Sequence, residues 1–275
     1  MIVLKTESQI DKMREAGRLV AEYLELVTNI AAPGITTLAI DDLAASFAKR
    51  HGAIAAFKGY KNFPYSICAS VNNEVIHGMP NDKPLRDGDI LSVDYGILLD
   101  GYHGDSAITL AIGDIPDSTK KLINIGQECL YHGVNKFRRG SRLNEISYAI
   151  QSHAESNGYG VVRDFVGHGI GRDLHEDPQV FNYTNKPKEG IMLQEGLILA
   201  IEPMVVEGSY NLRTEKNGWT VVTEDRKLSV HWEHTVVLTG KGLEVLTLRQ
   251  GENYERQEGD TNKYQQWLDS NWGFI

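Results

Sequence analysis

The hydrophobic residues recur at helical spacing in four parts of the chain. In the first part, Thr6 and Gln9 form a capping box, which is typical of the start of a helix. The apolar positions behind it share one helical face: Ile10, Met13, Val20 and Val27. Helices are therefore predicted over 7–30, 38–50, 116–137 and 143–157.

Between and after these helices the apolar residues follow patterns typical of strands. The predicted strands are 66–71, 90–99, 197–206, 219–223, 228–238 and 244–248. Asp100-Gly101 predicts a two-residue hairpin turn. Two helices followed by strands, twice over, indicate an α+β fold with two similar halves and mostly antiparallel pairing.

No low-complexity linker separates these halves, so residues 1–248 are expected to form one compact domain. Residues 249–275 form a polar C-terminal extension that also carries several aromatic side chains. We favour packing of these aromatic residues onto the domain over a separate partner-binding role.

Composition narrows the class of protein. Hydrophobic residues make up 41% and charged residues 24%, as in ordinary folded proteins, and the net charge of −9 argues against a general nucleic-acid binder. The chain has no apolar run of membrane-spanning length and no pattern of a signal peptide. Cys68 and Cys129 are its only cysteines, so a reduced, cytoplasmic protein that does not enter membranes is expected.

Two aspartates stand out in the predicted hairpin. With Asp100-Gly101 as the turn, Asp94 faces Ala107 and Asp105 faces Gly96, so both carboxylates lie on one face with Cα atoms about 7–8 Å apart. A solvated face would tolerate this pair, but the flanking strand residues are apolar. Taken alone, this pair of aspartates supports a metal or catalytic site about as well as it supports a solvated face.

Three more residues have the chemistry of metal ligands. His168 lies among the glycines of 167–171, whereas Glu202 and Glu233 lie in apolar strand patterns, where a carboxylate is costly unless it is paired. Alternatively, His168 is an ordinary loop histidine, and the two glutamates face outward from their strands. Taken together, the four carboxylates would balance the charge of two divalent cations. Oxygen ligands combined with one imidazole suit Mn, Fe, Co or Zn. Paired metals lower the pKa of a bridging water, which indicates hydrolysis.

The motifs around these residues resemble those of the bacterial-type type I methionine aminopeptidases of metallopeptidase family M24. The resemblance covers residues 1 to about 248 and rests on Ser70–Pro80, Asp94, Asp105, Gly167–Gly171, Leu174–Pro178, Ile201–Pro203 and Glu233–Thr235. It implies the pita-bread (creatinase/aminopeptidase) fold, with two pseudo-symmetric halves and helices on the outer face of an antiparallel sheet. It also implies hydrolytic removal of the N-terminal methionine from nascent proteins and peptides with a small second residue, by a metal-bridging water or hydroxide.

The resemblance assigns a role to each matching position. It implies two divalent metal ions (Co, Mn, Fe or Zn) held by Asp94, Asp105, His168, Glu202 and Glu233. Asp105 and Glu233 would bridge the metals, and Glu202 would also shuttle a proton. His77 and His175 would contact the substrate and stabilise its scissile carbonyl. The methionine pocket would be lined by Tyr60, Phe63, Cys68 and Trp219, with Leu174 and Phe57 nearby.

Other members of the fold and a non-enzymatic relative are the alternatives. Only 76 residues precede His77, too few for the N-terminal domain usual in the related proline peptidases, and the 27 positions from His175 to Glu202 leave no room for the insertion of type II enzymes. A pure binding protein would be expected to lack metal ligands, and all five positions are chemically competent here. The expected partners are a nascent polypeptide or peptide substrate and the ribosome, and the chain is expected to be a monomer.

Overall fold

A computed structural model of the protein describes residues 1–254. Its four long helices are α1 (Glu7–Ile30), α2 (Thr37–Arg50), α3 (Asp117–Val134) and α4 (Leu143–Ser156). They lie within three residues of the predicted ranges at every end. Most of the expected C-terminal extension, residues 255–275, lies outside the described residues.

The first half of the chain contributes five strands and a short 3-10 helix. These are β1 (Ile54–Ala55), η1 (Tyr60–Asn62), β2 (Cys68–Val71), β3 (Glu74–Ile76), β4 (Ile90–Leu99) and β5 (Tyr102–Ala111). Strand β4 is the centre of this half, because it pairs with β1, β2 and β5.

The second half, as far as residue 254, contributes ten strands. These are β6 (Gly160–Val161), β7 (Gly167–Gly169), β8 (Glu176–Val180), β9 (Ile198–Ile201), β10 (Met204–Val206), β11 (Leu212–Thr214), β12 (Val221–Thr223), β13 (Ser229–His231), β14 (His234–Thr239) and β15 (Gly242–Val245). They form a five-stranded sheet in the order β15-β14-β9-β7-β8 and two three-stranded sheets, β13-β10-β6 and β11-β12-β3. Strand β3 of the first half thus pairs with β12 of the second.

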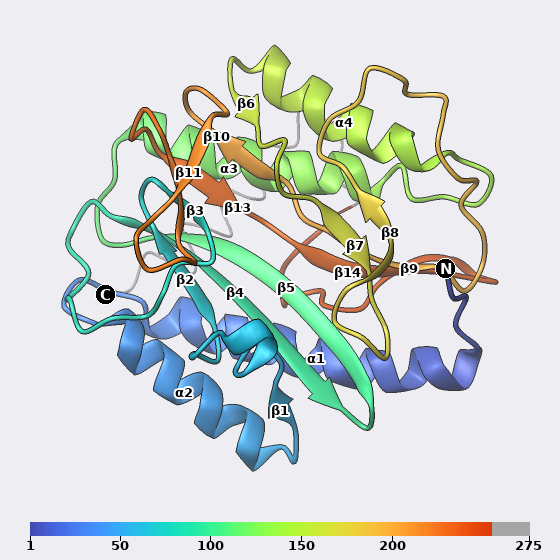
Figure 1. Ribbon diagram of the computed structural model, residues 1–275, viewed down its shortest axis with the longest axis horizontal. Coiled ribbons are helices and arrows are strands. Elements are labelled where there is room, and N and C mark those ends of the chain that lie inside the picture. The colour runs from blue at the N-terminus through green and yellow to red at the C-terminus, as the bar shows by residue number, and fades with distance from the viewer. Residues whose placement is uncertain (255–275) are drawn as a thin grey trace.

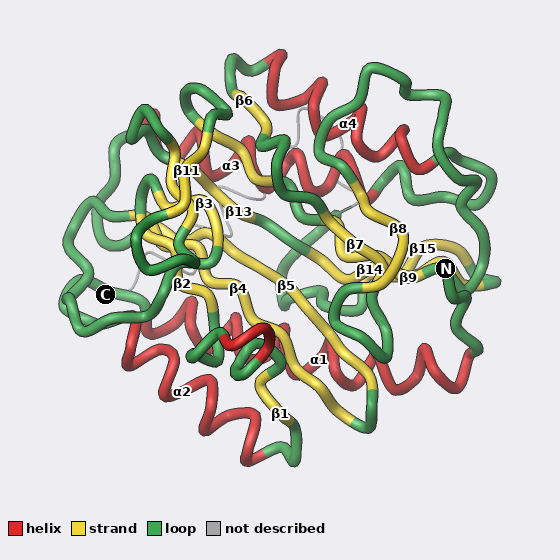
Figure 2. Tube along the Cα trace, viewed as in Figure 1, coloured by secondary structure: helices red, strands yellow, loops and turns green. Residues whose placement is uncertain are grey.

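The two helix pairs lie on opposite sides of the strands. Figure 1 shows α1 and α2 on one side of the β4–β5 hairpin and α3 and α4 on the other side of the molecule, with the strands between them. Figure 2 shows the same layers by element type. Every strand pairing among the described residues is antiparallel, which confirms the predicted α+β layout.

The hairpin has the register that the sequence predicts. Leu99 pairs with Tyr102, Asp94 with Ala107 and Gly96 with Asp105. Both turn residues, Asp100 and Gly101, have positive φ angles of 48° and 78°, as a two-residue turn between right-twisted strands requires. The two aspartates therefore share one face of the ladder.

Two predicted long strands are each divided in the structure. The run 197–206 is interrupted between β9 and β10 at Glu202-Pro203, and the run 228–238 between β13 and β14 at Trp232-Glu233. A continuous strand was the wrong prediction in both cases. Pro203 has no N–H for a ladder, and the main chain of Glu233 donates instead to Ala107 O of β5, at 3.0 Å. Both interruptions place a glutamate at a strand end.

Helix α1 packs very closely on the hairpin. A Cβ atom at Gly104 would lie 2.7 Å from the backbone nitrogen of Gly17, and one at Gly17 would lie 2.4 Å from the carbonyl oxygen of Leu246. Glycine at these positions lets the backbones of helix, hairpin and C-terminal segment approach one another. This contact fixes the strand that carries Asp105.

The described part of the chain continues to pack beyond the residue-248 boundary expected from composition. Arg249 is buried, and Tyr254 packs against the main hydrophobic core. Separately, none of the helices within residues 1–254 combines the length and apolar character that a membrane crossing requires.

Replacing Gly104 by alanine tests the close packing of α1. We expect Gly104→Ala to lower the free energy of unfolding by about 1–3 kcal/mol, because its methyl group has no room against backbone atoms. Ser118→Ala, on the exposed face of α3, is the control and is expected to change stability by less than about 0.5 kcal/mol. Urea unfolding followed by circular dichroism measures both, and equal stability of the two variants would contradict the tight contact.

Candidate active site

The five predicted metal ligands come from both halves of the fold. Asp94 and Asp105 lie on β4 and β5, His168 lies on β7, and Glu202 and Glu233 lie at the strand interruptions described above. His168 pairs with Ala200 across β7 and β9, two residues before Glu202. One cavity of about 160 Å³ is lined by all five residues.

Burial makes this cluster unfavourable for bare negative charge. It raises the pKa of Asp94, Glu202 and Glu233 well above the ordinary values of their carboxyl groups, and nearby carboxylates raise them further. Burial also raises the pKa of Asp105 to about 7. The cluster therefore requires either protons or cations.

The unsatisfied oxygens of the cluster fit a divalent metal. Within the described part of the chain, Asp94 Oδ1, Asp105 Oδ1 and Glu233 Oε1 are buried and have no hydrogen-bond partner. Ligand atoms of Asp105, His168 and Glu233 all lie within 4.8 Å of one another. Buried polar atoms normally have partners, so these oxygens have the arrangement expected of metal ligands.

His168 is held in the state that a metal ligand needs. Its Nδ1 lies 2.8 Å from the carbonyl oxygen of Gly169, which can only accept, so Nδ1 carries the proton and Nε2 offers a lone pair. Nε2 lies 3.4 Å from Glu202 Oε1. Burial lowers the pKa of His168 to about 4, which keeps the ring neutral at pH 7.

Two further histidines line the same cavity. The His175 ring stacks on Tyr60 and lies 4.3 Å from His168, between centroids, and its Nδ1 lies 2.9 Å from the Tyr60 hydroxyl. His77 follows β3 with a φ of 56° and makes edge contacts with Phe165 and Trp219. Burial lowers the pKa of His77 to about 4 and that of His175 to about 3, so both are neutral donors or acceptors.

An apolar wall adjoins the carboxylates. Strand β2 places Cys68 directly opposite Asp94, and the Phe57 ring packs against Gly96, the partner of Asp105. The other residues of this wall that line the cavity are Tyr60, Phe63, Leu174 and Trp219. They belong to a hydrophobic cluster distinct from the main core. All the predicted pocket residues are thus brought together, while their role toward a substrate stays a prediction.

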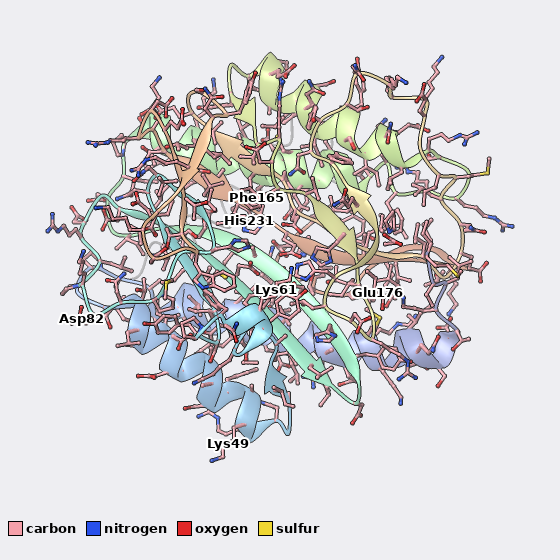
Figure 3. All side chains as sticks on the ribbon, in the orientation of Figure 1. Lys49, Lys61, Asp82, Phe165, Glu176 and His231 are labelled. Atoms are coloured by element: carbon pink, nitrogen blue, oxygen red, sulfur yellow. The ribbon has the colours of Figure 1, made fainter. Side chains whose placement is uncertain are left out.

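Two residues at the site were not predicted from the sequence. Lys61 is the one lysine or arginine among the described residues lining the cavity, and its Nζ lies 5.3 Å from the centre of the Tyr60 ring. His231 is buried, with Nε2 3.6 Å from Glu202 Oε2. Figure 3 shows both labelled residues near the middle of the molecule. The sequence did offer a signal for both residues, because Lys61 directly follows Tyr60 and His231 lies two positions before Glu233.

A larger cavity, of about 310 Å³, lies elsewhere and includes Lys5, Tyr102 and Glu176 in its lining. None of the candidate site residues lines it. We assign the chemistry to the smaller cavity because that one contains the buried, unpaired carboxylates. The four carboxylates and one imidazole that line this cavity are the ligands typical of a divalent-metal hydrolase.

Comparison with known proteins identifies the family. A model of metallopeptidase family M24 matches residues 11–240. The chain belongs to this family and therefore uses a divalent metal. This confirms the family that the sequence motifs predicted.

The relatives are similar over nearly their whole length. The methionine aminopeptidase of Clostridium acetobutylicum is 51% identical over 249 residues, which cover 90% of this chain and 99% of that protein. Methionine aminopeptidase 1 of Bacillus subtilis is 49% identical over 247 residues, with the same coverage. The crystal structure of methionine aminopeptidase from Rickettsia prowazekii matches with a TM-score of 0.88 at 43% identity, covering 90% of this chain and 100% of that one.

A more distant structure shares the fold alone. The prolidase from Pyrococcus furiosus matches with a TM-score of 0.73 at 20% identity, covering 90% of this chain and 66% of that one. These matches confirm the predicted pita-bread fold.

Removing one carboxylate tests the metal assignment. We expect Asp105→Ala to weaken metal binding by more than about 100-fold, because the change deletes an expected ligand and not merely a supporting group. Titration of the metal-free protein with Mn²⁺ measures this affinity. Asp82→Ala, at an exposed position, is the control. Turnover retained by Asp105→Ala with metal added would contradict the two-metal assignment.

Changing Lys61 tests its electrostatic effect on His77. Burial is the main cause of the lowered pKa of His77, and the positive charge of Lys61 lowers it further by disfavouring the imidazolium ion. Lys61→Met should therefore raise the pKa of His77 from about 4 toward 6.5 without reaching it. NMR titration of the metal-free protein measures the change, with Lys49→Met as an exposed control; an unchanged pKa would exclude the effect.

Proposed function

We propose that the protein is a methionine aminopeptidase that hydrolyses the first peptide bond of peptides and nascent chains. The observation that carries the proposal is the single cavity that joins a carboxylate–imidazole cluster to an apolar wall. The similarity to methionine aminopeptidases at 49–51% identity supports the same activity.

The substrate's first side chain would lie against the apolar wall. A thioether is flexible and polarisable and makes favourable contacts with aromatic rings and sulfur. Phe63 and Trp219 contact each other edge to face, with centroids 5.0 Å apart, and Cys68 places a thiol on the same wall. We also propose that the enzyme prefers a small second residue.

The chain's own residues would orient and polarise the bond. With the Tyr60 hydroxyl donating to Nδ1, neutral His175 carries its proton on Nε2 and can donate it to the carbonyl oxygen. His77, which lies next to Trp219 in the same cavity, would contact the same peptide. Glu202, which lies between His168 and His231, has a raised pKa and is suited to accept a proton and return it to the leaving amine.

Two metal ions fit the ligand set. Asp94, Asp105, His168, Glu202 and Glu233 would hold them, since four carboxylates balance two divalent charges. Bound there, Co, Mn, Fe or Zn would supply Lewis-acid polarisation and activation of the attacking water. The substrate amine would be recognised beside the same negative cluster, which selects for a free N-terminus.

The cellular setting stays a prediction. The proposed substrates are nascent polypeptides, which is consistent with a cytoplasmic location and with action near the ribosome. We also propose that the chain acts as a monomer.

Peptide hydrolysis tests the proposed function directly. After chelation and return of Co²⁺, Mn²⁺ or Fe²⁺, we expect methionine release from Met-Ala-Ser and none from Ala-Ala-Ser or Xaa-Pro peptides, because the apolar wall suits a methionine side chain. Mass spectrometry of the products measures specificity. Cleavage before proline would contradict the assignment of the pocket, and no release with any metal would point to a binding protein on this fold.

A further inference from the structure

The segment that follows the last strand forms a buried polar network behind the metal site. Arg249 is 6% exposed and Glu252 is similarly buried, although both belong to the part of the chain that composition marks as a polar extension. Arg249 Nη2 donates to Glu252 Oε1 at 2.7 Å, and its backbone N–H donates to Glu252 Oε2 at 2.9 Å. The two charges therefore balance within the interior.

One arm of this network leads to Glu233. Arg249 Nη1 donates to Ser106 Oγ at 2.9 Å, and the Ser106 hydroxyl in turn donates to the carbonyl oxygen of Glu233. Ser106 directly follows Asp105 on β5. The guanidinium is thus linked, through one hydroxyl, to the main chain at the two residues expected to bridge the metals.

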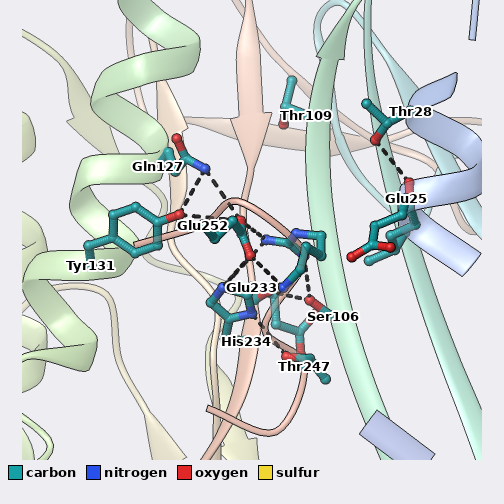
Figure 4. A network of polar contacts seen from close by, with 12 residues as sticks. Glu25, Thr28, Ser106, Thr109, Gln127, Tyr131, Glu233, His234, Thr247 and Glu252 are labelled. Atoms are coloured by element: carbon teal, nitrogen blue, oxygen red, sulfur yellow. Dashed lines mark hydrogen bonds and ion pairs between the residues drawn. The ribbon is translucent and has the colours of Figure 1, made fainter. Parts of the chain in front are cut away.

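A second arm holds the strand that begins after Glu233. His234 Nδ1 lies 2.9 Å from Thr247 Oγ1, which also accepts from the backbone N–H of Thr235 at 3.1 Å. The Thr235 hydroxyl donates to the carbonyl oxygen of Asp105 at 2.8 Å. Figure 4 shows Glu233, His234, Thr247 and Ser106 in this cluster, with Glu252 at its centre.

On the α3 side of the network, two residues hydrogen-bond Glu252. Tyr131 and Gln127, both on α3, donate to Glu252 Oε1 at 3.2 and 3.4 Å. The contacts of Arg249 and those of Tyr131 are therefore separable by mutation, because both residues bond Glu252 but Arg249 also bonds Ser106.

We propose that Arg249 is a positioning residue of the metal site, which fixes Glu233 relative to Asp105 by way of the Ser106 hydroxyl. The inference rests on the proposed function only in taking Glu233 and Asp105 as metal ligands. Groups that orient metal ligands typically change metal affinity when they are removed.

A double-mutant cycle on metal affinity tests this role. Mn²⁺ affinity of the metal-free full chain is measured by competition with a chelating indicator for wild type, Arg249→Met, Ser106→Ala and the double variant. We expect each single change to weaken binding by about 10-fold, and the double variant to be little weaker than Arg249→Met, because both changes break one chain of bonds. The Co²⁺ absorption spectrum of each single variant should also shift, as ligand geometry changes.

Tyr131→Phe is the matched control for loss of stability. It removes a hydrogen bond to Glu252 and leaves the bonds from Arg249 to Ser106 in place, so it should lower the melting temperature without changing metal affinity. If Arg249→Met fails to fold, Arg249→Lys and Ser106→Ala complete the comparison. Metal affinity at the wild-type value in variants that lose only stability would overturn the proposal. Strictly additive losses in the cycle would overturn it as well. Because the readout is metal affinity, the result does not depend on which peptide the enzyme cleaves.

Discussion

The site depends on the docking of the segment 233–235 onto strand β5. Glu233 N–H donates to the Ala107 carbonyl, and Thr235 exchanges hydrogen bonds with the main chain of Asp105. These bonds join the half of the fold that carries Asp94 and Asp105 to the half that carries His168, Glu202 and Glu233. They hold together carboxylates that repel one another, and they satisfy backbone groups of both halves.

The cluster that results is costly for the folded protein and useful for chemistry. Buried carboxylates with unpartnered oxygens disfavour folding unless a cation compensates them. The fold tolerates this cost because the surrounding strands are apolar and well packed, and because the hydroxyl groups of Thr235 and Ser106 satisfy the neighbouring main chain. An unfavourable local arrangement at a functional site is common in enzymes.

The specificity of the proposed reaction follows from the same sheet. Strand β4 carries Asp94 toward the cavity and pairs with β2, which places Cys68 beside it. Metal chemistry and apolar recognition therefore share one ladder and are held at a fixed separation. Tyr60 connects the two functions, since it lines the apolar wall and also bonds His175.

Local patterns in the sequence predicted the helices, the hairpin register of Asp94 and Asp105 and, through short motifs, every ligand candidate. These features depend on neighbours in the chain, through periodicity, turn chemistry and residue type. Pro203 was a local signal for the break beside Glu202, and the positions of Lys61 and His231 close to Tyr60 and Glu233 in the sequence were a partial signal for their place at the site. The tertiary structure alone decided that the second strand breaks at Glu233 and that Arg249 is buried behind the site. Such features arise from contacts between residues more than a hundred positions apart, as between Ser106 and Arg249, and no local pattern encodes them.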